Sequence, residues 1–116
     1  MLRKGLRVRR KGEFRRIFEE GKTFAGRGLV LYVLPGKGKT RAGFTVARRV
    51  GTKVAKNRLK RRLSEAYRLL QGQVSDGYLL IFLGQEKAAH LPFTELQSSI
   101  VKLLNKAGLM AGRDER

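Results

Sequence analysis

The chain has 116 residues, enough for one domain that buries roughly two-thirds of its unfolded surface, which excludes a second domain of similar size. Its 27 Lys and Arg against 9 Asp and Glu give a net charge of +18, so the molecule repels itself and should bind polyanions, nucleic acid first among them. The lack of cysteine excludes disulfides, a thiolate nucleophile and a cysteine zinc site, and the short apolar runs predict neither a signal peptide nor a membrane span, so we expect a cytoplasmic protein.

The positive charge is concentrated in the first 70 residues. These hold 22 bases and 4 acids, whereas residues 71–116 hold 5 of each. Membrane binding would require large apolar side chains facing lipid along an amphipathic helix, and the apolar residues of this chain follow core patterns instead. The charge distribution therefore favours nucleic acid as the partner.

Residues 1–11 are basic and lack periodicity, which predicts an arm that is disordered alone or lies along a polyanion. A short helix is expected over residues 12–20, because Phe14, Ile17 and Phe18 share one face and Gly21 is placed as its C-terminal cap. By base rate, Phe14 and Phe18 are core residues.

Two strands are expected next. Residues 29–34 are β-branched and aromatic, and Pro35-Gly36 closes the run. Residues 41–47, with Ala42, Phe44 and Val46 on one face, are the expected antiparallel partner across a hairpin. The glycine-rich basic turn between them lacks the spacing of a nucleotide-binding loop.

The strongest pattern is a helix over residues 53–68. An apolar stripe repeats at helical spacing along Leu59, Leu63, Ala66, Tyr67 and Leu70. The opposite face consists of Asn57, Arg61, Ser64 and Arg68, with Arg58 and Lys60 at its sides. Like charges at helical spacing each cost a few tenths of a kcal/mol. Solvated faces usually mix both signs, so this face is expected to contact phosphates.

The remaining elements complete a fold prediction. Residues 78–83 are continuously apolar, as in a central strand covered on both faces. Pro92 opens a last helix that ends at Gly108 and buries Leu96, Ile100, Leu103, Leu104 and Ala107, and residues 109–116 form a loose tail. The order helix, two or three strands, helix, strand, helix predicts one α+β domain over residues 1–116, a two-layer sandwich of three helices on a small mixed sheet. General rules would make a parallel crossover right-handed.

The sequence offers no catalytic constellation and no metal site. His90 is the only histidine and lies in the charge-neutral part of the chain, where a surface position is more common than a general base. The acids of that part are scattered. This composition fits a non-catalytic subunit, which binds RNA while another molecule supplies the catalytic groups.

One stretch resembles a known family. Residues 48–61 run Arg-Arg-Val-Gly-Thr-Lys-Val-Ala-Lys-Asn-Arg-Leu-Lys-Arg, and Glu65-Ala66 follow. This resembles the signature of the bacterial ribonuclease P protein subunit, and so do Phe14-Arg-Arg-Ile-Phe18 and the strand that begins at Leu29. Three positions depart from the family pattern: Lys56 replaces the usual first Arg of an Arg-Asn-Arg run, Thr52 replaces Asn, and Lys53 replaces a small residue. Lysine keeps the charge of Lys56 but not the planar fork of arginine.

The resemblance implies a strand-helix-strand crossover that is left-handed, against the general rule. It also implies a partner RNA that catalyses the magnesium-dependent removal of the 5′ leader from precursor transfer RNA, with Mg²⁺ bound mainly by RNA and no obligate protein partner. The residues expected to bind the catalytic RNA are Arg48, Arg49, Lys53, Lys56, Asn57, Arg58, Lys60, Arg61, Arg62 and Arg68. Those expected to bind the leader, in a cleft between the sheet and the first helix, are Phe14, Arg15, Phe18, Tyr32 and Phe44.

Two other functions stay open at this point. A ribosomal or RNA-chaperone protein would bind RNA by charge alone, and its affinity would follow phosphate count and salt rather than the presence of a leader. A stand-alone nuclease would cleave RNA without any RNA partner.

Overall fold

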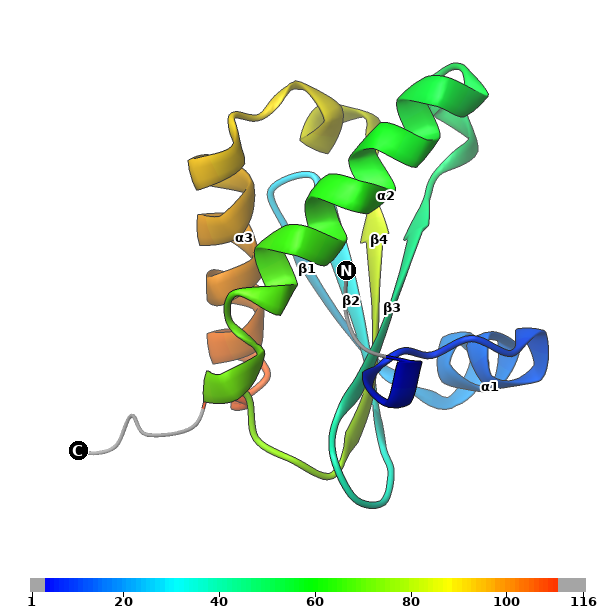
Figure 1. The fold of residues 1–116 in the computed structure, drawn as a ribbon, viewed down its shortest axis with the longest axis vertical. Coiled ribbons are helices and arrows are strands. Elements are labelled where there is room, and N and C mark those ends of the chain that lie inside the picture. The colour runs from blue at the N-terminus through cyan, green and yellow to red at the C-terminus, as the bar shows by residue number, and fades with distance from the viewer. Residues whose placement is uncertain (1–3, 111–116) are drawn as a thin grey trace.

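The computed structural model describes residues 4–110 and has a four-stranded mixed sheet at its centre, in the order β1-β2-β4-β3 (Figure 1). Strand β1 pairs antiparallel with β2, β2 antiparallel with β4, and β4 parallel with β3. The strands are β1 (Lys22–Gly26), β2 (Leu29–Pro35), β3 (Arg41–Val46) and β4 (Tyr78–Gly84).

The position of β4 corrects one expectation. The sequence predicted an antiparallel hairpin of β2 and β3, but β4 lies between them and β3 is parallel to it. Four consecutive residues of β4, from Leu79 to Phe82, are buried, and a strand that is apolar at every position must be covered on both faces. The predicted central strand is thus confirmed, and it displaces β3 to the edge of the sheet.

Strand β1 was not identified in the sequence. Only Phe24 among its residues is half-buried and the other four are exposed, so the strand carries no apolar alternation. It is an edge strand held by its backbone pairing with β2.

The helices lie on both faces of the sheet. Helices α2 (Lys53–Arg68) and α3 (Phe93–Lys106) cover one face, and α1 (Lys11–Glu20) packs on the other (Figure 1). The bounds of α2 match the predicted ones, and α+β is the observed class. In Figure 1 both β3 and β4 point upward, α2 crosses in front of the sheet, and the chain moves to the left, so the crossover is left-handed. The general right-handed rule fails for this connection.

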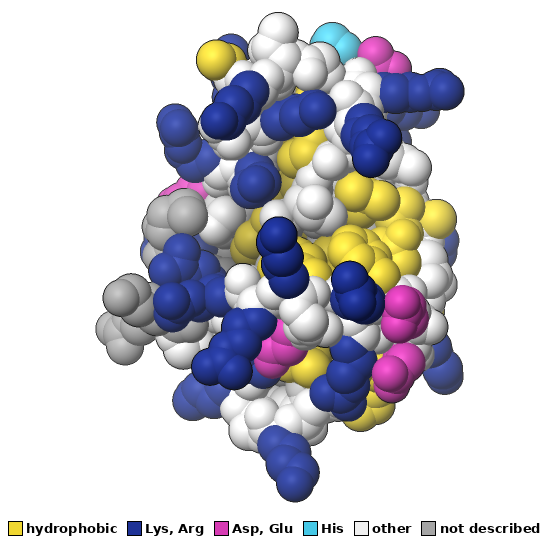
Figure 2. All heavy atoms as spheres, turned by 90° about the vertical axis from the view of Figure 1, so that its right-hand side faces the viewer, with side chains coloured by type: hydrophobic (Ala, Val, Ile, Leu, Met, Phe, Trp, Pro, Cys, Tyr) yellow, Lys and Arg dark blue, Asp and Glu magenta, His cyan; other side chains and the backbone are white. Residues whose placement is uncertain are grey.

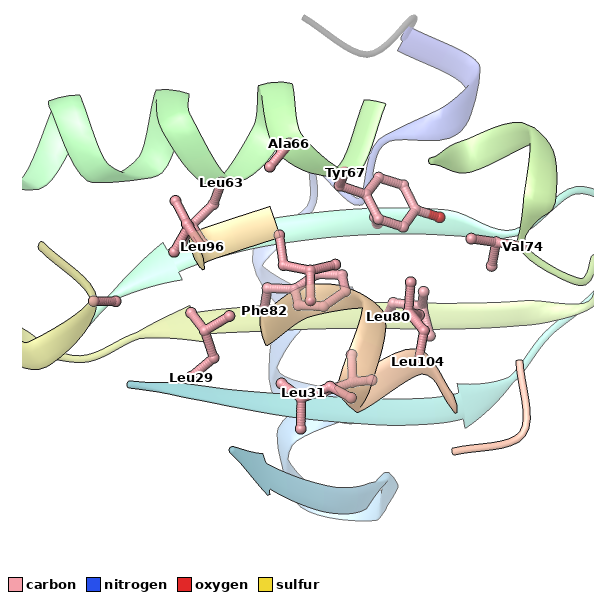
Figure 3. Packing of buried hydrophobic residues seen from close by; sticks show 14 of the residues in the cluster. Leu29, Leu31, Leu63, Ala66, Tyr67, Val74, Leu80, Phe82, Leu96 and Leu104 are labelled. Carbon is pink, nitrogen blue, oxygen red and sulfur yellow. The ribbon is translucent and has the colours of Figure 1, made fainter. Parts of the chain in front are cut away.

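The main core lies between the sheet and the pair α2 and α3. Tyr67 of α2 packs against Phe82 of β4, with ring centroids 5.5 Å apart, and leucines from every layer surround them (Figure 3). Burial raises the pKa of the Tyr67 phenol above its usual value of 10.0. Of the predicted α3 stripe, the four large residues are buried and Ala107 is partly buried.

Both ends of the described chain pack more than the sequence predicted. After the 3₁₀ turn η1 (Lys4–Leu6), Val8 is buried, and its N–H donates to the carbonyl of Ala42 on the open edge of β3 (3.0 Å). At the other end Leu109 is buried and Met110 forms a bridge with Val74. The arm and the tail therefore contribute to the fold within the described residues, and positions 1–3 and 111–116 lie outside them.

Gly21 ends α1 as predicted, but for a steric reason. Its N–H donates to the carbonyl of Ile17 (2.9 Å), and its φ of −76° is open to any residue. A Cβ at this position would lie 2.6 Å from the same carbonyl oxygen, so only glycine fits. None of the helices within residues 4–110 combines the length and apolar character that a membrane crossing requires.

Candidate nucleic-acid interface

Helix α2 presents a basic face because its apolar stripe is fully used by the core. The helix begins after Thr52, whose Oγ1 accepts a hydrogen bond from the N–H of Ala55 (3.1 Å). Leu59, Leu63 and Ala66 are buried, which turns the basic side chains outward. The exposed residues of the predicted set are Arg48, Arg49, Lys53, Asn57, Arg58, Lys60 and Arg61, and Lys56 is half-buried.

These exposed cations are absent from the ion pairs found between residues 4 and 110. The ion pairs found within residues 4–110 involve Arg16, Arg27, Arg41 and Arg68, and none involves the exposed lysines and arginines of η2 (Arg48–Val50) or α2. Unpaired guanidinium groups on a rigid helix are suited to phosphate oxygens, which they can bind in a bidentate manner.

Three residues predicted to face RNA have partners inside the protein or are buried. Arg62 donates a hydrogen bond to the carbonyl of Leu91 (2.5 Å), and so links α2 to the segment before α3. Arg68 donates two hydrogen bonds to the carboxylate of Glu65, of 3.0 and 2.6 Å, and this interaction lowers the pKa of Glu65. Ser64, expected on the exposed face, is buried. The interface is therefore narrower than the helical pattern implied.

An aromatic cluster lies on the other face of the sheet, beside α1. The rings of Phe18 and Tyr32 meet edge to face with centroids 4.7 Å apart, and Phe14 is 6.3 Å from Phe18. Phe18 remains 38% exposed, and Phe14 and Tyr32 are half-buried. The base-rate expectation of core residues thus holds only in part, because each ring packs on protein and also keeps an accessible surface. Arg15 is exposed on the same helix.

Phe44 does not join this cluster. Side chains alternate along β3, and Phe44 points to the α2 side, where it stacks on Phe82 with centroids 5.8 Å apart. Its neighbour Gly43 faces α1 instead, and a Cβ there would lie 2.7 Å from Cζ of Phe14. The missing side chain lets the Phe14 ring lie directly over the edge of β3.

A groove along the edge of β3, here called the β3 groove, joins the two sides. It encloses about 270 Å³. Its residues come from the N-terminal segment (Arg7, Val8, Arg9), α1 (Phe14), β3 (Ala42, Gly43, Phe44) and α2 (Asn57, Lys60, Arg61, Ser64). Figure 2 views the face that carries α1 and β3 and shows an apolar area bordered by Lys and Arg side chains.

The sequence did not identify several residues of this groove. Arg7 and Arg9 were assigned to an arm expected to be disordered alone or to lie along a polyanion, whereas the pairing of Arg7 and Val8 with Ala42 places them at β3. Gly43 gave one usable signal, since glycine inside a strand often marks a close approach of another group.

The described residues contain no group of three or more His, Cys, Asp or Glu side chains that could hold a metal ion. His90 is exposed at the end of η4 (Glu86–His90), beside Arg58 and Arg62 rather than in the β3 groove. The chemistry available at this surface is that of hydrogen bonding, positive charge and aromatic stacking.

Known proteins are similar to this chain over most of its length. A sequence model of the family described as Ribonuclease P matches residues 2–108. The ribonuclease P protein component of Chloroflexus aurantiacus is 42% identical over 111 residues, which cover 94% of this chain and 82% of that protein. The corresponding protein of Caldanaerobacter subterraneus is 39% identical over 110 residues, covering 94% of this chain and 95% of that protein.

Among solved structures, an RNase P protein mutant from Staphylococcus aureus superposes with a TM-score of 0.84, covers 92% of both chains and is 24% identical, which shows the shared fold. The sequence match extends over nearly the whole chain, including α1, the β3 groove and the basic helix. The chain therefore belongs to the ribonuclease P protein family.

Proposed function

We propose that this chain is the protein component of a ribonuclease P that removes the 5′ leader from precursor transfer RNA. In this proposal the basic face of η2 and α2 binds the catalytic RNA, and the β3 groove with the aromatic cluster beside α1 binds the leader. The RNA performs the cleavage, and the protein holds the two RNAs next to one another.

The observation that supports this proposal best is that the two surfaces adjoin. Lys60 and Arg61 belong to the basic face of α2 and also line the β3 groove, opposite Phe14. A single strand leaving an RNA bound on α2 would therefore enter the groove directly. Its bases could stack on exposed aromatic surface, at about 1–3 kcal/mol per base, while the arginines contact its phosphates.

The groove does not have the composition of a protein-bound magnesium site. Mg²⁺ prefers carboxylate and water oxygens, whereas the described lining of the β3 groove contains arginines, a lysine, Asn57, Ser64 and apolar groups but no carboxylate. We therefore assign Mg²⁺ to the RNA and derive no step from a metal bound to this chain.

The test is cleavage of a precursor transfer RNA at low magnesium concentration in three samples. One contains a bacterial ribonuclease P RNA, one contains this protein, and one contains both. Efficient cleavage at the leader junction only in the combined sample supports the proposal. Cleavage by the repurified protein alone would indicate a nuclease.

A second measurement separates leader recognition from attraction by charge. The assembled complex should prefer a precursor with a leader over mature transfer RNA by more than the added phosphates explain. A protein that binds RNA by charge alone would show no such preference at matched salt, because its affinity depends only on phosphate number.

A further inference from the structure

A second hollow, here called the arginine pocket, opens on the other side of the N-terminal segment from α2. It encloses about 640 Å³ and is lined by Gly5, Arg7, Arg9, Arg10, Glu13 and Arg41. Arg7 and Arg9 also line the β3 groove, so the two hollows adjoin along the N-terminal segment and together define one path that leads away from α2. No α2 residue lines the arginine pocket, which places it at the end of this path farthest from the basic helix.

The charges in the pocket are not balanced within it. Four arginines and one glutamate line the pocket, and the carboxylate of Glu13 is already engaged, because Arg41 donates to both of its oxygens. The Nε atom of Arg7 is buried and has no hydrogen-bond partner among the described residues. A buried donor of this kind costs free energy unless a partner binds it.

The first turn of α1 adds backbone N–H donors that have no partner inside the helix. Arg10 is the N-cap residue, and its side chain makes no capping hydrogen bond. The first helical bond runs from the N–H of Phe14 to the carbonyl of Arg10 (3.0 Å), so the N–H groups of the first turn have no partner inside the helix. Basic residues are disfavoured at this positive end of a helix, and an anion is favoured there.

We propose that the arginine pocket binds a phosphodiester group of the leader strand, upstream of the nucleotides that occupy the β3 groove. This inference rests on the proposed leader-binding function. It assigns Arg7, Arg9, Arg10 and Arg41 to the leader, and makes Glu13 the residue that positions the Arg41 guanidinium. Since the pocket lies at the far end of the path, only a long leader should reach it.

The experiment compares two precursors, one with a single-nucleotide leader and one with a leader of about ten nucleotides, a common scale for single-strand sites. Each is bound by the complex assembled with ribonuclease P RNA over a series of salt concentrations. The variants are Arg10→Gln and Arg10→Asp. Arg16→Gln is the charge-matched control, since Arg16 is exposed on the same helix and lines neither hollow.

For Arg10→Gln, the log–log salt dependence with the long leader should flatten by about 0.7 relative to Arg16→Gln. Binding of the short-leader precursor and of ribonuclease P RNA alone should stay at the Arg16→Gln level. Arg10→Asp should weaken long-leader binding further while raising the melting temperature, because aspartate at this N-cap satisfies the first-turn N–H groups. A loss of affinity together with a gain in stability cannot arise from misfolding.

Two results would overturn the inference. Equal losses with both leaders, or weaker binding of ribonuclease P RNA alone, would assign the phosphate to the catalytic RNA. Arg10 variants that match Arg16→Gln throughout would mean that the pocket binds no phosphate of the leader. Failure of the proposed function itself is seen separately, as a wild-type complex with no preference for the longer leader.

Discussion

Replacing Arg61 and Arg62 one at a time should separate RNA binding from folding. The two residues are adjacent and carry the same charge, but Arg61 is exposed on the wall of the β3 groove while Arg62 donates to the carbonyl of Leu91 (2.5 Å). Arg61→Ala should change the free energy of unfolding by less than about 0.5 kcal/mol, as for most surface substitutions. Arg62→Ala removes a charged hydrogen bond to a buried residue and should cost about 1.5 kcal/mol or more.

The effects on RNA binding should be reversed. Loss of one phosphate contact at Arg61 should reduce the log–log salt slope for ribonuclease P RNA by about 0.7–0.9. The advantage of the wild type over Arg61→Ala should then shrink about threefold between ~50 and ~200 mM salt. For Arg62→Ala the melting temperature should fall by roughly 5–10 °C, with a smaller change in the salt slope.

The assays are thermal unfolding by circular dichroism and RNA binding over a salt series, with Lys102→Ala as control. Lys102 is exposed on α3 and lies in neither RNA surface, so its removal tests whether total charge alone sets the slope. Equal losses of melting temperature in Arg61→Ala and Arg62→Ala would refute the division of roles. So would a salt slope that Lys102→Ala lowers as much as Arg61→Ala does.

Three further outcomes are expected. Gly43→Ala places a Cβ 2.7 Å from Cζ of Phe14, so it should lower the free energy of unfolding by about 1–3 kcal/mol and weaken leader binding. An unchanged stability in thermal unfolding would show that the Phe14 ring moves freely and would contradict this prediction. The raised pKa of Tyr67 contributes stability that is fully present below pH 10.0 and is lost as the pH rises above that value. The free energy of unfolding, measured with denaturant, should therefore fall more at alkaline pH for the wild type than for Tyr67→Phe. Parallel pH curves for the two proteins would contradict this. The lowered pKa of Glu65 contributes stability that is present above pH 4.5 and is lost as the pH falls through and below that value. Arg68→Gln should lack this contribution, so its free energy of unfolding should fall less than that of the wild type as the solution is acidified. The same loss of stability with acid in both proteins would contradict this.

Periodic elements could be predicted from the sequence, whereas strand pairing could not. Helix α2 has the predicted bounds because its apolar spacing and its start are both local signals. The partner of β3 is decided by the burial of β4, which lies more than 30 residues further along the chain. A glycine-rich turn between two strands usually marks a hairpin, so the local signal pointed to the wrong neighbour.

The types of residue on this surface could be predicted from the sequence, but the element that each side chain would face could not. Alternation along β3 correctly grouped Ala42, Phe44 and Val46 on one face, but gave no indication of which helix they would face. Helical spacing likewise could not distinguish Arg61 from Arg62, since the carbonyl that binds Arg62 belongs to Leu91, far away in the sequence. The assignment of these residues to particular RNAs stays a prediction.

The strand order that the sequence missed is also what creates the β3 groove. If β3 had paired with β2, β3 would lie inside the sheet and would form no edge beside α2. With β3 at the edge, Gly43 faces α1 and Phe44 faces α2 on the two sides of one edge strand. The N-terminal segment pairs with that edge at Ala42, through the bond from Val8. The β3 groove along this edge lies between the basic residues of α2 and Phe14 of α1, and this combination of charge and aromatic surface suits the single-stranded leader that we propose as its ligand.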